Sequence, residues 1–437
     1  MSGSDTANPT GVYGILGVAS TSNVPGARSS PANWTDRSGN LWLFGGFGVD
    51  SAGSTGSLND LWEFNPSTKE WTWVSGSDTV NASGVYGTLG VAAANNVPGA
   101  RNSTTSWVDT NGNLWLFGGS GNDSTGNGGF LNDLWEFSPS GKMWTWVSGS
   151  NTVYAFGIYG TVGVSAGSNV PGARVSCASW IDGSGNLWLF GGYGNATNGA
   201  QGNLNDLWEF SPTMNVWTWM SGSDGVGLND SGEPGIYGTQ GTPSASNVPG
   251  GRSAAVSWMD ASGNLWLFGG LGADSTGSGT EGYLNDLWEF SPTSKMWTWM
   301  SGSDTANATG VYGTVGVTSA SNIPGGREGA VGWIDSSGNL WLFGGDSEGP
   351  NSEVFLNDLW RFSPDSKQWT WMSGSSTVNA GGVYGSLGVP SVNNVPGARS
   401  GAIGWLDESG NLWIFGGSLP VPTGGSLPAN DLWRYQP

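Results

Sequence analysis

The chain has 437 residues, of which 37% are hydrophobic and 11% charged, with a formal net charge of −20. This acidity argues against binding to nucleic acid or to an anionic membrane surface, because phosphate contacts need clustered Lys and Arg. The sequence contains no histidine and only one cysteine, which removes the commonest metal ligand and general base and excludes an internal disulfide framework.

Repetition is the dominant pattern along the chain. All 28 tryptophans fall at equivalent positions of a unit that occurs six times. Each unit contains, in order, Asn-Val/Ile-Pro-Gly-Ala/Gly-Arg, Gly-Asn-Leu-Trp-Leu/Ile-Phe-Gly-Gly, Asn-Asp-Leu-Trp and, in all but the last, Trp-Thr-Trp. A fixed period of this length predicts a repeat architecture. We expect repeats at approximately 23–76, 96–149, 169–222, 247–302, 322–374 and 394–437, joined by long Gly/Ser/Asn-rich linkers, with 1–22 as a linker-type segment.

Four segments of each repeat have the pattern of β-strands. The first is built from small residues, as in Ser253–Ser257, which favours a strand packed where backbones converge. The second, as in Asn113–Phe117, is apolar on both faces because strand side chains alternate, so both faces must be covered. The fourth, as in Trp144–Val147, places both tryptophans on one face, which indicates an outer edge strand. Side-chain size therefore increases from the first strand to the last.

The connections between these segments are of two kinds. Asp-x-x-Gly-Asn, as at 109–113, and Ser-Pro-x-x-Lys, as at 291–295, have the chemistry of tight turns. The segments after the Gly-Gly doublet (47–57) and after Trp-Thr-Trp (77–96) are long and variable. In a four-stranded meander these two long connections emerge on the same face, which we expect to carry most of the loops.

These features resemble the kelch-repeat family of β-propellers. The shared marks are an arginine opening the first strand, a Gly-Gly doublet ending the second, and aromatic residues in the third and fourth. The resemblance implies an all-β fold in which 1–437 form a single six-bladed β-propeller of four-stranded antiparallel blades. Kelch-type folds include the central domain of galactose oxidase, but its copper site requires histidine ligands, so this chain cannot build it. The Asp-x-x-Gly-Asn hairpin also resembles the Asp-box of sialidase-type propellers.

The last repeat lacks a Trp-Thr-Trp segment. We therefore expect the last blade to lack its outer strand, leaving Asn430–Tyr435 as an exposed edge that could pair with another chain. A closed ring with a three-stranded final blade is one interpretation. A window cut from a longer array, or a blade completed by another subunit, is the other.

The repeated arginines are the first candidate ligand-binding residues. Each opens a first strand on the loop-bearing face, so together they would surround the mouth of a central channel, where kelch-like modules bind acidic peptides. The alternative is that each pairs with an aspartate such as Asp60, tying blade to blade. The six residues are Arg28, Arg101, Arg174, Arg252, Arg327 and Arg399.

The linker tyrosines of Val/Ile-Tyr-Gly are the second candidate. A ring of exposed tyrosines among Asn, Asp and Ser would suit stacking against sugar rings. The alternative is that each tyrosine pins its own linker against the blade. The six residues are Tyr13, Tyr86, Tyr159, Tyr237, Tyr312 and Tyr384.

We expect no enzymatic activity, because catalysis needs an asymmetric constellation of residues whereas these arginines recur identically. We expect no catalytic residue, cofactor, metal site or membrane insertion, and Cys177 is interpreted as a small buried apolar residue. The first function class is a non-enzymatic module that binds a protein segment or carbohydrate on its loop-rich face. The second is a structural or surface-display protein that associates with itself through the exposed edge.

Departures from the repeat distinguish these two classes. The fourth linker (223–246) is the longest, Glu328 follows the fifth arginine, and the sixth repeat has a proline-rich loop at 419–428. Convergence of these three segments would favour a specific binding pocket. We expect a secreted or cell-surface location, in a bacterium, with the export signal absent from this chain.

Overall fold

The computed structural model describes residues 9–197, 199–349, 353–386, 388–407, 409–421, 425–429 and 431–437. The described residues form antiparallel β-sheets and one short 3-10 turn, which confirms the predicted all-β class. No helix among them is long and apolar enough to cross a membrane. Two compact units share the chain, Met1–Gly202 with Asp206–Gly225, and Asn203–Asn205 with Val226–Pro437.

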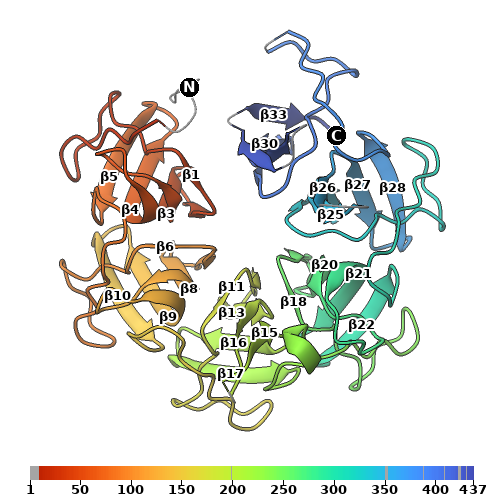
Figure 1. Cartoon of the computed structure of the whole chain (residues 1–437), viewed down its shortest axis with the longest axis horizontal. Helices are drawn as coiled ribbons and strands as arrows, with labels where there is room; N and C mark the ends of the chain where they lie inside the picture. Colours follow the sequence, from red (N-terminus) through yellow and green to blue (C-terminus); the bar gives the residue numbers. More distant parts are fainter. Residues whose placement is uncertain are drawn as a thin grey trace. The chain divides into compact units, whose positions relative to one another are not determined.

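The first three repeats make up most of the first unit (Figure 1). Their strands are β1 (Arg28–Ser29), β2 (Ala32–Thr35), β3 (Leu41–Val49), β4 (Thr55–Asn65) and β5 (Glu70–Ser75); β6 (Arg101–Asn102), β7 (Thr105–Val108), β8 (Leu114–Asn122), β9 (Gly128–Ser138) and β10 (Met143–Ser148); and β11 (Arg174–Val175), β12 (Ala178–Ile181), β13 (Leu187–Phe190), β14 (Tyr193–Asn195), β15 (Gln201–Asn203), β16 (Leu207–Ser211) and β17 (Val216–Ser221).

The last three repeats lie in the second unit. Their elements are η1 (Leu228–Asp230), β18 (Arg252–Ser253), β19 (Val256–Met259), β20 (Leu265–Gly272), β21 (Gly282–Ser291) and β22 (Met296–Ser301); β23 (Val331–Ile334), β24 (Leu340–Phe343), β25 (Asp346–Glu348), β26 (Glu353–Phe355), β27 (Leu359–Ser363) and β28 (Gln368–Ser373); and β29 (Ile403–Leu406), β30 (Leu412–Phe415), β31 (Ser418–Pro420), β32 (Ser426–Pro428) and β33 (Leu432–Tyr435).

In the first, second and fourth repeats, two short opening strands, such as β1 and β2, both pair with the next strand, which gives five-stranded sheets, whereas the third and fifth repeats have four-stranded sheets in chain order. The order is β12-β13-β16-β17 in the third repeat and β23-β24-β27-β28 in the fifth, with antiparallel neighbours. The Trp-Thr-Trp strand lies at the edge of the sheet in the first five repeats, as predicted. The described part of the sixth repeat forms a three-stranded sheet, β29-β30-β33, and Asn430, the first residue of the predicted edge, lies outside the described residues.

Aromatic and aliphatic side chains fill the space between consecutive repeats of one unit. Between the first and second repeats, Trp42 lies 5.7 Å from Phe137 and Phe44 lies 5.4 Å from Trp144, measured between ring centroids. Corresponding clusters join the second repeat to the third, the fourth to the fifth, and the fifth to the sixth. Both faces of a sheet are thereby covered, which explains why the second strand is apolar on both sides.

Small residues in the first strand allow neighbouring backbones to bond directly. Ser103 N donates to Ser30 O at 3.0 Å and Ser176 N donates to Ser103 O at 3.2 Å. In the second unit, Gly401 N donates to Gly329 O at 2.9 Å. The predicted close approach of first strands is therefore confirmed within each unit.

Each linker divides into two parts. Its first part packs on the long loop of the preceding repeat, where Asn81 N donates to Ser57 O at 2.7 Å, so the two long connections do lie together. In the linkers before the second to fifth repeats, the second part covers the outer strand of the following repeat, where Gly90 N donates to Trp146 O at 2.7 Å. Residues 9–22, expected as a linker-type segment, cover β5 in the same way through Gly17 N and Trp73 O.

The Gly-Gly doublet marks a close backbone contact between repeats. Gly118 has φ = 62°, and a Cβ atom on it would lie 2.8 Å from Arg174 O and 2.9 Å from Leu131 O. No side chain fits there, because both contacting atoms belong to the backbone. The doublet is thus required by the approach of the next repeat's arginine.

Gly118→Ala should lower the free energy of unfolding by about 3 kcal/mol, from left-handed strain and overpacking together. Gly112→Ala is the matched control, since Gly112 has φ = 85° but nothing within 4 Å of the added Cβ. The control should cost about 1–2 kcal/mol, from strain alone. Urea denaturation measures both, and equal losses would contradict the packing role of Gly118.

Candidate functional site

One buried aspartate per repeat gathers the polar side chains that the sequence singled out. In the second repeat, the two carboxylate oxygens of Asp133 accept hydrogen bonds from Arg101 Nη1 and Nη2 at 2.6 and 2.7 Å. Oδ2 also accepts from the Tyr86 hydroxyl at 2.6 Å and from Trp135 Nε1 at 2.7 Å. Arg101 therefore forms the bidentate pair that carboxylates favour, within a network of four side chains.

Backbone carbonyls engage further donors of the same guanidinium. Arg101 Nε donates to Gly99 O at 2.9 Å and Nη1 donates to Gly118 O at 3.1 Å. The arginine thus connects its own strand, the Gly-Gly doublet and the third strand. Such dense hydrogen bonding is what a buried ion pair needs to offset the loss of hydration.

The same ion pair recurs in all six repeats, with Nη1–Oδ1 distances of 2.6–2.7 Å and arginine side chains at most 5% exposed. Pairing of the arginines with aspartates is thus confirmed, but the prediction that each pair ties blade to blade is wrong, because both partners belong to one repeat. The pairs are Arg28–Asp60, Arg101–Asp133, Arg174–Asp206, Arg252–Asp286, Arg327–Asp358 and Arg399–Asp431.

The arginine backbone makes the link between repeats instead. Gly270 N donates to Arg327 O at 2.8 Å, and Gly345 N donates to Arg399 O at 2.9 Å. A side-chain hydrogen bond adds to this link between repeats. Asn59 Nδ2 donates to Pro98 O, in the next repeat, at 3.1 Å. The arginine, the Gly-Gly doublet and the Asn-Asp motif therefore all contribute to the contact between repeats.

Burial and charge act together on the network. Burial alone would raise the pKa of Asp60 and Asp358. The facing guanidinium and the donated hydrogen bonds lower it by more than burial raises it, so the pKa of both carboxyls lies below its usual value. Burial, and then the facing aspartate, raise the pKa of Tyr13 and Tyr86 well above 10. Asp60 and Asp358 are therefore ionised, and Tyr13 and Tyr86 protonated, at neutral pH.

The expected exposure of the tyrosines is wrong for most of the set. Tyr13, Tyr86, Tyr159 and Tyr237 are at most 6% exposed, and Tyr312 is half-buried. Each ring packs against two tryptophans of its repeat while its hydroxyl donates to the aspartate, which is the pinning role considered as the alternative. Tyr384 differs, because it is 53% exposed.

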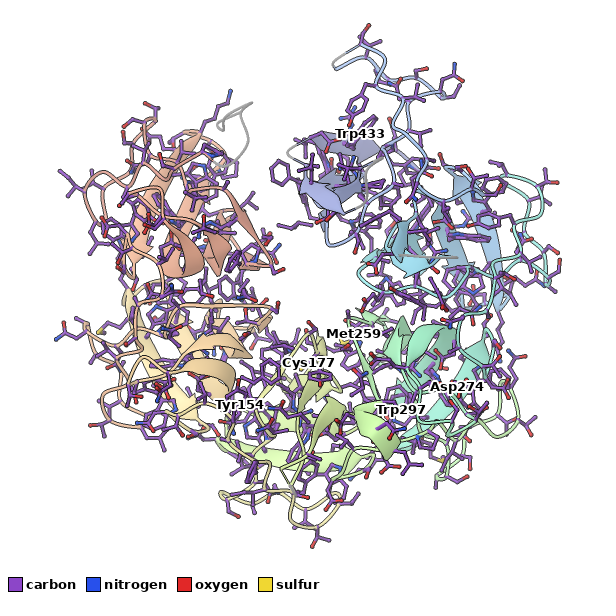
Figure 2. All side chains as sticks on the ribbon, viewed as in Figure 1. Tyr154, Cys177, Met259, Asp274, Trp297 and Trp433 are labelled. Atoms are coloured by element: carbon purple, nitrogen blue, oxygen red, sulfur yellow. The ribbon has the colours of Figure 1, made fainter. Side chains whose placement is uncertain are left out.

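Tyr384 is more exposed because its ring packs against one tryptophan among the described residues, where the other tyrosines pack against two. Its hydroxyl still donates to Asp431 at 2.8 Å and its ring lies 4.9 Å from that of Trp433. The second tryptophan contact, 5.0 Å between Tyr312 and Trp371 in the fifth repeat, has no counterpart among the described residues of the sixth. Figure 2 labels Trp433 on this last sheet.

A cavity of about 390 Å³ lies among loops of the fourth repeat. Ten linker residues (225–234) stand there where the fifth repeat has five (305–309), and the extra chain forms η1. Asn229 Nδ2 donates to Gly279 O at 3.3 Å, which holds the linker against the loop between β20 and β21. The lining includes Leu228, Ser231, Glu233, Ala273, Asp274 and Thr280.

The three irregular segments named above converge only in part. The backbones of Glu328 and Asp346 form an antiparallel β-bridge, as do those of Ser400 and Ser418 at the start of the sixth loop. The Ser400 hydroxyl also donates to Asp346 Oδ1. The fifth and sixth departures are therefore neighbours. The fourth linker instead forms its own cavity, and residues 422–424 of the sixth loop lie outside the described residues.

Cys177 is half-buried rather than fully buried, and packs against the cluster between the second and third repeats. Burial raises the pKa of its thiol to about 12, so the thiolate is scarce at neutral pH. Among the described residues, no group of three or more Cys, Asp and Glu side chains is arranged to hold a metal ion.

The sequence did not lead us to expect the exposed aliphatic residues that recur in the linkers. Val85, Leu89 and Val91 are each about half exposed, and other linkers present equivalent residues. The recurring Val-Tyr-Gly-x-Leu/Val-Gly-Val pattern was the available signal. It was missed because linkers are expected to be polar.

Comparison of the chain with protein-family models found no matching family, and comparison with curated proteins found no match.

Asp358→Asn should lower the free energy of unfolding by about 3–5 kcal/mol, because it leaves the Arg327 charge buried without a counter-ion. Tyr312→Phe removes one hydrogen bond to the same carboxylate and should cost about 1–2 kcal/mol. Denaturant midpoints of the two variants provide the comparison. Similar, small losses for both would mean that the ion pair is not the centre of the repeat.

Proposed function

We propose that this chain is a non-enzymatic binding module of the kelch type, a six-bladed β-propeller that holds a protein segment or glycan on its loop-rich face. The third and fifth repeats each have a four-stranded antiparallel sheet, and in the first, second and fourth repeats the sheet has five strands because two short opening strands, such as β1 and β2, pair with the same neighbour. A crowded opening strand and an aromatic outer strand are features expected of a propeller blade. The described residues of the sixth repeat form three strands of the same kind, β29, β30 and β33.

The repeated polar residues are engaged within the fold and leave few groups for a ligand. The arginines and most tyrosines satisfy the buried aspartates, so their charges and hydroxyls are engaged within the fold. Specific function is then expected where the repeats differ. The six arginines and the buried tyrosines are therefore not expected to contact a ligand.

The loop cavity of the fourth repeat is the observation that carries the proposal. Its lining combines Leu228 and Ala273 with the acidic residues Glu233 and Asp274, a mixture of apolar and polar groups that suits small polar ligands or a peptide turn. Burial would raise the pKa of Asp274, but hydrogen bonds from Thr276 and from backbone N–H groups together outweigh it and hold the pKa below its usual value. That side chain therefore presents a negative charge at neutral pH.

The proposal predicts that a glycan and peptide array probed with the intact chain will yield a ligand. Replacing residues 225–234 by the five-residue sequence of 305–309 removes the extra linker, and should weaken that binding by about tenfold or more, a change of at least 1.4 kcal/mol. Circular dichroism checks that the replaced chain folds. Val392→Ala, at an almost fully exposed linker position, is the control and should bind normally.

If no ligand binds at millimolar concentration, or if the chain with the replaced linker binds as well as the original, the proposal that the loop-rich face binds a ligand is wrong.

A structural or assembly protein is the second candidate. The exposed aliphatic residues of successive linkers favour it, since repeated apolar surface can mediate association. Association between copies is required here, so a chain that sediments as a monomer at high concentration contradicts this candidate.

A further inference from the structure

Three aromatic side chains form a row where the second and third repeats meet. The ring of Phe130, in β9, lies 5.8 Å from the ring of Tyr154 and 5.9 Å from the ring of Tyr193, and both contacts are edge-to-face. Tyr154, labelled in Figure 2, belongs to the linker between the two repeats, and Tyr193 opens β14. All three residues lie in the first unit.

The aromatic row is partly open to solvent. Tyr154 is 45% exposed, and Phe130 and Tyr193 are half-buried. Phe156, two residues further along the linker, is 55% exposed, and a Cβ atom added to Gly199 would lie 3.0 Å from its Cζ atom. Single exposed apolar residues need no explanation, but neighbouring ones mark an interaction site.

Tyrosine at position 154 is a departure from the repeat. The equivalent position is asparagine in three other linkers, at Asn81, Asn307 and Asn379. All four residues have a positive φ of 55–58°, in the left-handed region. Asparagine tolerates this conformation, whereas a bulky side chain is an outlier there.

The tyrosine also gives up a hydrogen bond that asparagine makes. In the fourth repeat, Asn307 Oδ1 accepts a hydrogen bond from Tyr283 N at 2.8 Å, and in the fifth, Asn379 Oδ1 accepts one from Phe355 N at 2.8 Å. A tyrosine side chain has no oxygen at that place. A strained residue that also loses a local hydrogen bond points to a role outside folding.

The surrounding chain holds the Tyr154 ring in place. Tyr154 N donates to Phe130 O at 2.7 Å, and Asn195 Nδ2 donates to Tyr154 O at 2.7 Å. A Cβ atom added to Gly129 would lie 2.5 Å from Tyr154 Cε2, so the ring packs directly on the backbone of β9. A ring that is fixed before binding loses little conformational entropy when a ligand covers it.

The surroundings of the row are polar but almost uncharged. Segments 120–130, 149–157 and 193–202 contain a single charged residue, Asp123. Asp123 is fully buried, and its carboxylate accepts hydrogen bonds from the backbone of its own loop. The other polar side chains are hydroxyls and amides such as that of Gln201. A charged ligand would meet no exposed counter-charge from these segments, so a neutral ligand is favoured.

We propose that this aromatic row binds a neutral oligosaccharide. The C–H groups on one face of a pyranose ring are attracted to the negative face of an aromatic ring, which Tyr154 presents to solvent with Phe156 beside it. The hydroxyls of the sugar bond the nearby amides and the tyrosine hydroxyls. This site goes beyond the loop cavity of the fourth repeat and does not depend on it.

A proline-rich peptide is the other ligand that aromatic surfaces accept. Its proline residues offer only carbonyl acceptors, whereas sugar hydroxyls both donate and accept hydrogen bonds. Amides and hydroxyls around the row also do both, as Gln201 Nε2 shows by donating to Asn195 Oδ1 at 2.9 Å. The sugar is therefore the better match.

The test is isothermal titration calorimetry of the full chain with three neutral hexasaccharides, of β-1,4-linked glucose, β-1,4-linked mannose and α-1,4-linked glucose. At least one should bind saturably. A sulfated hexasaccharide and a proline-rich peptide are the comparison probes. If none of the neutral sugars binds at millimolar concentration, or if either comparison probe binds more tightly, the proposal is wrong.

The variant Tyr154→Asn separates binding from folding. It should weaken sugar binding about tenfold or more, because it removes the exposed ring. The same change should raise the urea midpoint of unfolding, since asparagine tolerates the backbone conformation and restores the local hydrogen bond. Met214→Ala, at a position that is 64% exposed in a turn of the third repeat, is the control and should bind normally.

Two further variants complete the experiment. Tyr154→Phe keeps the ring and should retain most of the affinity, whatever its effect on stability. Replacement of residues 225–234 removes the extra linker of the fourth repeat and should leave hexasaccharide binding unchanged, so failures at the two sites are distinguishable. Unchanged sugar binding by Tyr154→Asn, or its loss on linker replacement, would overturn the assignment of the sugar to the aromatic row.

Discussion

The buried carboxylate of each repeat is the interaction on which the rest of the repeat depends. Asp133 receives two arginine nitrogens, a tyrosine hydroxyl and an indole nitrogen, from the first strand, the linker and the third strand. An unpaired charge at such a buried point would cost several kcal/mol, so all parts of the repeat must be in place together. Repetition of the motifs follows from repetition of this constraint.

The network also decides what remains for function. Its arginines and tyrosines look like ligand-binding residues in the sequence, because they are polar, aromatic and regularly spaced. Once their partners are assigned, few of these groups are free for a ligand. Binding is then left to irregular parts of the chain, such as the loop cavity beside Leu228.

Much of the fold could be predicted from the sequence. Alternation in Leu114–Phe117, turn residues such as Asp109 and Gly112, and small first strands encode local geometry directly, and the structure confirms each. The exposure of Tyr86 could not be read from the linker, because it depends on a hydroxyl partner 47 residues away. The cavity of the fourth repeat depends on how a longer linker folds onto a loop, which spacing alone does not define.

Arginine accessibility tests the central claim most directly. Modification of the folded chain with phenylglyoxal, mapped by mass spectrometry, should label Arg37 and Arg434, which are exposed. The six paired arginines should stay unmodified until the chain is unfolded, because their side chains are at most 5% exposed. Labelling of the paired arginines at the rate of Arg37 in the folded chain would contradict the account.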